Sequence, residues 1–238
     1  MPGRLIGVGV GPGDPDLITV KARDVLRDAD TVFVPVSRDA GDEPGYAERI
    51  VLEHLPHATR LVRLAFAVTD DQAERDASWR AAAEEVAEAL ATGATAAFAT
   101  IGDPNVYSTF THLAREVVLR VDDVEVTTVP GITAMQDLAA RSGTVLVERE
   151  EGLVLLPFTA ERERVASALA SGASVVLYKG GRMLPELGGL LVDHGRASTA
   201  VLGARLGLDG EHVGRLADHA DEPAPYLSTV IVPAERDR

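Results

Sequence analysis

The stretch that decides the fold is residues 4–22, which read RLIGVGVGPGDPDLITVKA. It begins with a short apolar run at 4–10, which is typical of a buried β-strand. A loop rich in glycine follows, and Asp14 with Pro15 then forms a common helix start, an N-cap residue with proline in the first turn. Apolar residues at helical spacing carry the expected helix to about Asp28. Strand, glycine loop and helix in this order predict the first unit of a parallel α/β sheet.

The same alternation continues along most of the chain. In the first half, the periodicity predicts strands at 31–36, 61–66, 95–101 and 124–129 and helices at 46–55, 71–91 and 106–120. In the second half, it predicts helices at 132–141, 161–170 and 184–194 and strands at 153–158, 174–178, 199–206 and 226–232. We therefore expect two α/β domains, residues 1–129 and 130–238, with a largely parallel first sheet and a second sheet that can be mixed.

The composition narrows the classes of protein. The chain has 238 residues, 46% of them apolar and none of them cysteine, so it can bury ordinary cores but has no disulfide, cysteine zinc site or thiol nucleophile. Its net charge of −14 and aromatic content of 4% disfavour nucleic-acid binding. No apolar stretch is long enough for a bilayer and no signal peptide is apparent, so we expect a cytoplasmic protein without membrane contact. The histidines are scattered, and His54 and His57 lack a third ligand, so we expect no metal site.

Three loops follow predicted strands, where parallel α/β sheets bind ligands. The first, at 7–14, contains four glycines whose spacing fits neither a dinucleotide fingerprint nor a phosphate-binding loop, and a tight turn capped by Asp14 also explains it. The second, Ile101-Gly102-Asp103-Pro104, offers close backbone approach and a carboxylate acceptor, although a type I turn has the same residues. The third, VPGITA at 129–134, is also compatible with a domain hinge.

Together, these loops resemble the tetrapyrrole methylases, the class III S-adenosylmethionine-dependent methyltransferases. The similar segments are GVGPGDPDLITVKA at 9–22, GDPNVYSTF at 102–110 and VPGITA at 129–134. Their order and spacing match, and the resemblance extends over essentially the whole chain. Within the family, YSTF at 107–110, YAERI at 46–50 and KGGR at 179–182 resemble the branch that methylates precorrin-2 at C(20).

The resemblance implies two α/β domains with the methyl donor, S-adenosylmethionine, in a cleft between them and S-adenosylhomocysteine as a product. It also implies a homodimer and a small tetrapyrrole substrate, with precorrin-3A formed in cobalamin biosynthesis. The donor contacts that it implies are Pro12, Ile101, Gly102, Asp103, Val106, Thr133, Ala134, Lys179 and Gly207. Gly203 competes with Gly207 for the last of these positions.

Two residues are candidates for the acceptor side of the site. Tyr107 follows the second loop, and Lys179, one of only two lysines in the chain, follows a predicted strand. Each also has an ordinary explanation, since Tyr107 can be a packed aromatic residue and Lys179 a solvated charge. The expected substrate is a polycarboxylate, and the candidates for clamping its carboxylates are Arg38, Arg49, Arg63 and Arg182.

Other functions stay open at this point. The acceptor could be another tetrapyrrole, such as uroporphyrinogen III or the cobalt complex of precorrin-2. The glycine-rich first loop is also compatible with a nucleotide-binding oxidoreductase, although its spacing is unfavourable. A module that binds the donor or a tetrapyrrole without catalysis would carry the same motifs. Methyl transfer from a sulfonium needs alignment and exclusion of water more than a strong acid or base.

Overall fold

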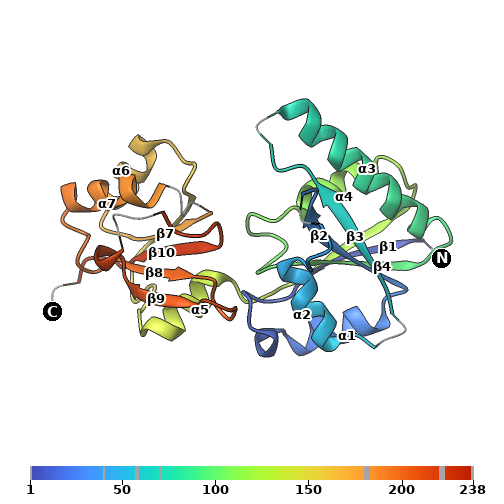
Figure 1. Ribbon diagram of the computed structural model, residues 1–238, viewed down its shortest axis with the longest axis horizontal. Coiled ribbons are helices and arrows are strands. Elements are labelled where there is room, and N and C mark those ends of the chain that lie inside the picture. Colours follow the sequence, from blue (N-terminus) through green and yellow to red (C-terminus); the bar gives the residue numbers. More distant parts are fainter. Residues whose placement is uncertain are drawn as a thin grey trace. The chain divides into compact units, whose positions relative to one another are not determined.

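The computed structural model describes residues 2–39, 41–56, 59–69, 71–179, 183–219 and 223–236. The chain forms two compact units, Met1–Thr133 and Ala134–Arg238 (Figure 1). The division predicted after Val129 and the boundary after Thr133 lie at the two ends of one short loop. Among the described residues, no helix combines the length and apolar character needed to cross a bilayer.

The first unit is built on a five-stranded sheet in the order β3-β2-β4-β1-β5, in which every neighbouring pair is parallel. β1 lies between β4 and β5, with Val8 opposite both Ala99 and Val129. Because parallel strands end at the same edge, the loops after β1, β4 and β5 start side by side. The strands are β1 (Arg4–Gly9), β2 (Thr31–Ser37), β3 (Arg60–Phe66), β4 (Thr95–Thr100) and β5 (Glu125–Val129).

Helices cover both faces of this first sheet (Figure 1). Successive side chains of a strand point to opposite faces. In β1, Leu5 joins the apolar cluster under α3 and α4, whereas Ile6 and Val8 join the cluster under α1 and α2. This double burial explains why β1 and β4 consist almost entirely of buried residues. The helices are α1 (Val20–Asp28), α2 (Tyr46–His54), α3 (Gln72–Leu90) and α4 (Phe110–Val118).

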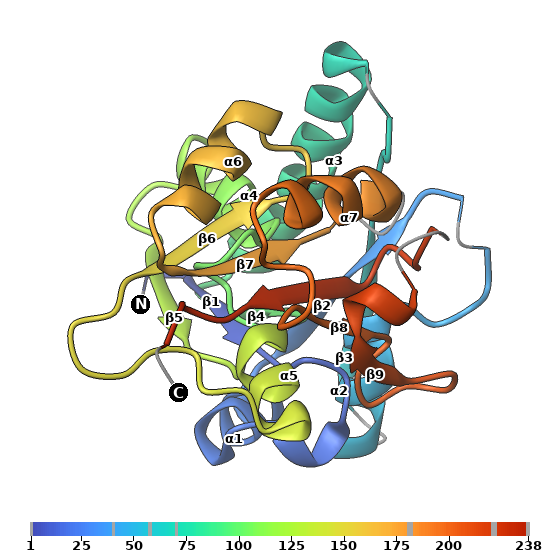
Figure 2. The same cartoon turned by 90° about the vertical axis from the view of Figure 1, so that its left-hand side faces the viewer.

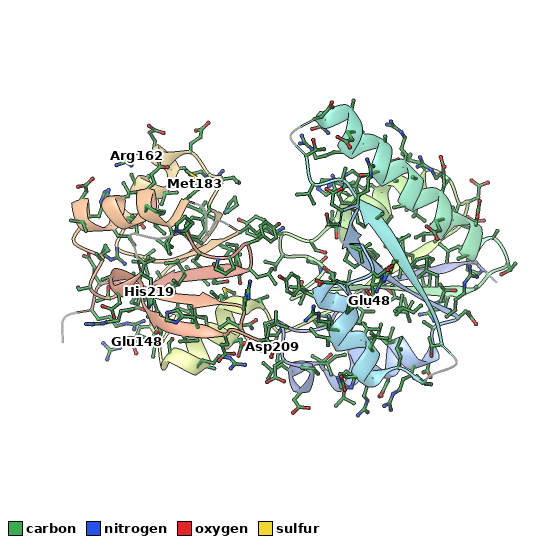
Figure 3. All side chains as sticks on the ribbon, in the orientation of Figure 1. Glu48, Glu148, Arg162, Met183, Asp209 and His219 are labelled. Atoms are coloured by element: carbon green, nitrogen blue, oxygen red, sulfur yellow. The ribbon has the colours of Figure 1, made fainter. Side chains whose placement is uncertain are left out.

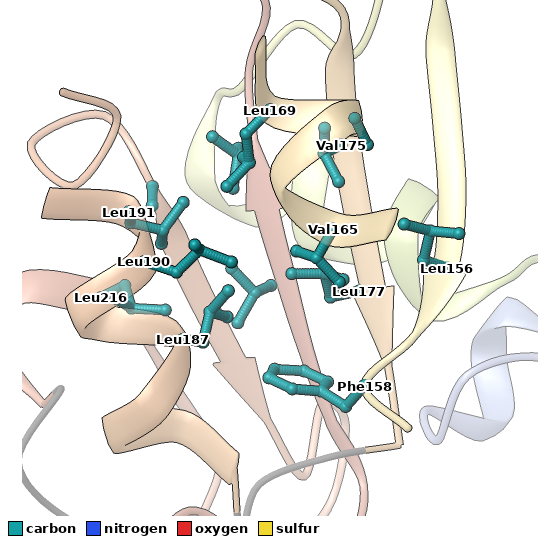
Figure 4. Packing of buried hydrophobic residues seen from close by; sticks show 14 of the residues in the cluster. Leu156, Phe158, Val165, Leu169, Val175, Leu177, Leu187, Leu190, Leu191 and Leu216 are labelled. Carbon is teal, nitrogen blue, oxygen red and sulfur yellow. The ribbon is translucent and has the colours of Figure 1, made fainter. Parts of the chain in front are cut away.

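The second unit has a mixed five-stranded sheet in the order β6-β7-β10-β8-β9. Only β6 and β7 pair in parallel, and the other three pairs are antiparallel, as the sequence allows. Helices α6 and α7 pack on one face through Leu169, Leu187 and Leu190 (Figure 4), and α5 packs on the other through Leu138. The elements are α5 (Ala134–Ser142), β6 (Leu153–Pro157), α6 (Arg162–Ala170), β7 (Ser174–Tyr178), α7 (Leu184–Asp193), β8 (Val201–Ala204), β9 (His212–Arg215) and β10 (Ser228–Val232).

A buried arginine ties segments of the second unit together. Arg196 follows α7, and its side chain is only 3% exposed. The guanidinium donates hydrogen bonds to the backbone carbonyls of Leu169, Ala173 and Pro233, at 2.9, 3.2 and 2.5 Å. A planar group with several donors suits this position, because it satisfies acceptors from three segments at once.

Two predicted helices begin later than the sequence indicates. Asp14 caps only a 3-10 turn at Pro15–Leu17, by accepting a hydrogen bond from the backbone N–H of Asp16 at 2.9 Å. The helix itself begins at Val20, where the Thr19 hydroxyl accepts from the N–H of Ala22 at 3.1 Å. The sequence thus contains two possible helix N-caps close together, Asp14 and Thr19, and the α-helix begins after the second of them.

The helix expected from residue 106 begins at Phe110 instead. Tyr107 has a φ of +47°, which is outside the right-handed helical region, so an α-helix cannot pass through this residue. The Ser108 hydroxyl accepts a hydrogen bond from the N–H of Phe110 at 3.1 Å and marks the new start. In the second unit, β8 is shorter than predicted, and β9 is a strand that the apolar periodicity does not indicate, because its four residues include His212, Gly214 and Arg215.

Candidate functional site

Three glycines bring the loops after β1, β4 and β5 into contact within the first unit. A Cβ atom added to Gly9 would lie 2.5 Å from the carbonyl oxygen of Gly102 and 2.6 Å from the backbone nitrogen of Gly131. A Cβ on Gly131 would overlap the same Gly102 oxygen. Only glycine permits backbones to approach this closely, which explains the residue type at Gly9 and Gly131.

Backbone hydrogen bonds hold the first and second loops together. The N–H of Gly102 donates to the carbonyl of Gly11 at 2.7 Å, and the N–H of Val10 donates to the carbonyl of Thr100 at 3.0 Å. Gly11 and Gly102 have φ values of +90° and +67°, in the left-handed region that favours glycine. Pro12, Ile101 and Gly102 therefore lie in neighbouring, rigidly joined backbone segments.

Asp103 connects the second loop to the third. One of its carboxylate oxygens accepts from the N–H of Gly131 at 3.0 Å, and the other accepts from the N–H of Asn105 at 2.8 Å. The family resemblance implies that Asp103 contacts the donor. In the structure, both of its oxygens already accept backbone hydrogen bonds, so its evident contribution is to hold two loops in register. Val106 lies in the same turn, with its N–H donating to the Asp103 carbonyl at 3.2 Å.

The second unit gathers its predicted site residues at one edge of its own sheet. β7 and β8 are each antiparallel to β10, so they run in the same direction and end beside the start of β10. Tyr178 pairs with Thr229 and Ala204 pairs with Ser228 at this edge. Lys179 follows β7 directly, and the loop that contains Gly207 follows β8.

The first turn of α5 reaches the same edge. The backbone N–H of Met135 donates to the hydroxyl of Tyr178 at 2.9 Å, which fixes the start of α5, and with it Ala134, beside the end of β7. Tyr178 is not among the site residues predicted from the sequence. A hydroxyl-bearing aromatic residue at a strand end was the only available signal, because its partner is 43 residues away.

Backbone strain marks both acceptor-side candidates. Tyr107 and Lys179 have φ values of +47° and +63°, which are uncommon for residues other than glycine. Such conformations cost roughly 1–3 kcal/mol each and cluster at ligand sites. Tyr107 is 40% exposed, and desolvation lowers the pKa of Lys179 below its ordinary value of 10.5. The two residues belong to different units.

The structure separates the two glycines that compete at the end of β8. A Cβ on Gly203 would lie 2.7 Å from a methyl carbon of Leu138, so Gly203 is small because α5 packs on it. Gly207 lies in the following loop with a φ of +70°. Packing thus accounts for Gly203 and leaves Gly207 as the candidate for ligand contact.

The candidate arginine clamps that the structure describes already have partners in the first unit. Arg38 forms an ion pair with Glu74 at 2.8 Å, and Arg49 donates to the carbonyl of Pro44 at 3.2 Å. Arg63 forms an ion pair at 2.8 Å with Glu48, whose buried side chain comes from α2 (Figure 3). Arg182 and His57 lie outside the described residues. Within the described ranges, no three histidine or acidic side chains gather into a metal-ligating group.

Most of the chain is similar in sequence to known proteins. Residues 4–218 match the family model of the tetrapyrrole (corrin/porphyrin) methylases. The chain is 37% identical to a precorrin-2 C(20)-methyltransferase of a Sinorhizobium species, over 99% of this chain and 97% of that one. It is 31% identical to the cobalt-precorrin-2 C(20)-methyltransferase of Salmonella typhimurium, over 98% and 97%.

Solved structures with the same fold include the cobalt-precorrin-4 methyltransferase CbiF, with a TM-score of 0.72 and 18% identity over 97% of this chain and 94% of that one. Another is uroporphyrin-III C-methyltransferase from Thermus thermophilus in complex with S-adenosylhomocysteine, with a TM-score of 0.66 and 23% identity over 96% and 97%. At these identities, the likeness concerns the fold alone.

Proposed function

The chain belongs to the tetrapyrrole (corrin/porphyrin) methylases, and we propose that it transfers the methyl group of S-adenosylmethionine to C(20) of precorrin-2, giving precorrin-3A. The observation that carries this proposal is the 37% identity to a precorrin-2 C(20)-methyltransferase along 99% of the chain. It agrees with the YSTF and YAERI sequences of this chain, which point to the same branch of the family.

The local geometry of each unit suits a donor of this kind. In the first unit, the proposed contacts are Pro12, Ile101, Gly102, Asp103, Val106 and Thr133, and in the second they are Ala134, Lys179 and Gly207. The N–H groups of Gly102 and Gly131 are already bonded to Gly11 and Asp103, and the glycines of these loops let a ligand approach the remaining loop peptide groups closely. The hydroxyl, amino and carboxylate groups of the donor are natural partners for such peptide groups.

The donor supplies a methyl group that its sulfonium has already activated. The carbon–sulfur bond breaks as the new carbon–carbon bond forms at C(20), and a proton leaves that carbon. The residues of the chain have to align the two reactants and keep water out. Alignment and exclusion of water can supply a large part of the rate increase that an enzyme gives over the uncatalysed reaction. We propose that Tyr107 and Lys179 line the acceptor side. The Lys179 ammonium suits a polycarboxylate, because opposite charges attract each other.

The assembly and location of the enzyme are part of the proposal. We propose a homodimer in the cytoplasm, with a small tetrapyrrole as substrate and no nucleic acid or membrane partner. The net charge of −14 supports the exclusion of nucleic acid, because a phosphate backbone would be repelled.

Product analysis tests the proposal. The purified protein is incubated with methyl-labelled S-adenosylmethionine and precorrin-2, and the methylated carbon is assigned by mass spectrometry and NMR. We expect one added methyl group at C(20). Parallel reactions with cobalt-precorrin-2 and uroporphyrinogen III identify a different acceptor.

Calorimetry separates the remaining classes of function. We expect S-adenosylhomocysteine to bind and NAD to leave the heat signal unchanged. Binding of NAD alone would indicate an oxidoreductase, and binding of S-adenosylhomocysteine without turnover of any of the three acceptors would indicate a module that only binds the donor.

A further inference from the structure

A chain of charged side chains links helix α5 to the loop that contains Gly207. Asp137 and Arg141 lie one turn apart on α5, with the Arg141 Nε atom 2.8 Å from Asp137 Oδ1. Arg141 Nη1 also contacts both carboxylate oxygens of Glu211, at 3.0 and 2.8 Å. Glu211 in turn accepts a hydrogen bond from the backbone N–H of Gly207, at 2.7 Å.

The loop at 205–211 needs support of this kind. Arg205, Gly207 and Gly210 have φ values of +50°, +70° and +77°, so much of the loop lies in the left-handed region. Leu206 anchors one point of the loop in the apolar cluster under α5. Asp209, near the tip, is exposed (Figure 3). Backbone hydrogen bonds also support the loop, among them the one from the Leu208 N–H to the Arg205 carbonyl at 3.0 Å, and the Glu211 carboxylate adds the side-chain bond to the Gly207 peptide group.

Helix α5, which carries Asp137 and Arg141, is itself firmly packed. It packs against β8, β9 and β10 (Figure 2), and Leu138 fits closely over Gly203. Its first turn is held at the end of β7 by the hydrogen bond between Met135 and Tyr178. One helix thus sets the spacing between Ala134 at its start, Lys179 after β7 and the Gly207 loop after β8.

Arg141 lies between two carboxylates that differ in exposure. The Asp137 side chain is 5% exposed and that of Glu211 is 35% exposed. Asp137 Oδ2 is buried and has no hydrogen-bond partner among the described residues. A buried ionised carboxylate needs a partner, so the ion pair with Asp137 holds Arg141 in place, and the Nη1 atom of Arg141 contacts Glu211.

We infer that Glu211, oriented by Arg141 and Asp137, is a positioning residue that sets the Gly207 loop for binding of the methyl donor. This inference rests on the proposed function, since it takes Gly207 as a donor contact. Glu211 does not touch the donor in this scheme. It acts through the backbone N–H of Gly207, and its loss lets the loop leave the binding orientation.

The test measures donor affinity in variants of Glu211. We expect Glu211→Ala to raise the Kd for S-adenosylhomocysteine and the KM for S-adenosylmethionine about tenfold, because a hydrogen bond to a charged group that orders a loop is lost. The KM for the tetrapyrrole and kcat at saturating donor should stay within about twofold of wild type. Glu211→Gln should recover part of the affinity, because an amide oxygen in place of Oε2 can still accept from Gly207.

The matched control is Asp218→Ala, which removes the exposed ion pair with Arg215 at 3.1 Å in the neighbouring segment. We expect it to leave the Kd unchanged. Urea unfolding of each variant monitors the fold, and Arg141→Lys, which keeps the charge but loses the planar fork, replaces Glu211→Ala if that variant does not fold. A merely structural role would lower the unfolding midpoint and leave the Kd unchanged.

The outcomes distinguish this inference from the proposed function. If wild-type protein does not bind S-adenosylhomocysteine, the proposed function fails. If wild-type protein binds it and folded Glu211→Ala binds it equally well, the inference about Glu211 is wrong while the proposed function stands.

Discussion

Replacing Gly9 with alanine tests the contact on which the first half of the candidate site depends. The new Cβ atom would lie 2.5 Å from the Gly102 oxygen and 2.6 Å from the Gly131 nitrogen, whereas real Cβ atoms essentially never approach closer than 3.0 Å. These neighbours are backbone atoms of two other loops, so no side chain can rotate away. The three loops therefore have to separate by about 0.5 Å or more.

The size of the effect follows from this displacement. Inserting a methyl group into a close-packed position that cannot relax destabilises a protein by about 1–3 kcal/mol. We therefore expect a loss of about 1–3 kcal/mol in the free energy of unfolding. If the shifted loops lose one hydrogen bond to the ligand, the Kd for S-adenosylhomocysteine increases roughly tenfold.

Urea unfolding and calorimetric titration with S-adenosylhomocysteine measure the two quantities. Gly189→Ala is the matched control, because nothing lies within 4 Å of the added Cβ and Gly189 is exposed on helix α7. It should stabilise the protein by about 0.5–1 kcal/mol and leave the Kd unchanged. If Gly9→Ala kept both the wild-type unfolding midpoint and the wild-type Kd, the close approach of the three loops would be refuted.

Three further predictions concern a buried group, a titrating pair and a site residue. Arg196→Met should lower the free energy of unfolding by about 3–5 kcal/mol in urea, because it removes three hydrogen bonds from a buried guanidinium to backbone carbonyls, while Arg215→Met, at an exposed position, should change it by less than ~0.5 kcal/mol. Hydrogen bonds from Arg236 lower the pKa of the Glu151 carboxyl from 4.5 to about 2. The stabilisation that this pair gives the folded protein is therefore complete above pH 4.5 and is lost as the pH falls towards 2. Glu151→Gln should flatten the stability profile in that window, and an unchanged profile would contradict the pairing. Lys179→Met should lower kcat/KM for the tetrapyrrole about tenfold, and unchanged turnover would remove Lys179 from the site.

Two of the arginines proposed as carboxylate clamps differ in how firmly they are held. Arg38 forms an ion pair with Glu74 and Arg63 forms one with Glu48, so the charge of each arginine is partly neutralised. The exposed pair of Arg38 is worth little, about 0–1 kcal/mol, and a carboxylate ligand can compete with it. Arg63 is bound more firmly, because Glu48 is buried and also accepts a hydrogen bond from the N–H of Gly45 at 3.1 Å. Arg38 is therefore the better suited of the two to exchange partners.

The sequence predicts most of the fold for identifiable reasons. The apolar run at 4–10 and the small residues at 95–101 are buried on both faces, and such continuous apolar runs are typical of the central strands of a parallel sheet. Glycines at the strand ends mark the loops of the candidate site, because close backbone approach excludes other residue types. β9 escapes prediction, since a short strand at a sheet edge can be made of polar residues and glycine.

What the sequence by itself determined is the alternating α/β pattern, the family and the three glycine loops, because these depend on local spacing and residue type. The sheet order of each unit and the network from Asp137 through Glu211 were decided only by the tertiary structure. Arg141 and Glu211 are 70 residues apart, and nothing in the local sequence of either residue specifies the other. Likewise, Asp103 appears in the sequence as a ligand-binding carboxylate, and only folding shows that its oxygens accept from Gly131 and Asn105. Hydrogen bonds between distant segments depend on where the sheet brings those segments, and that placement is a property of the packed chain as a whole.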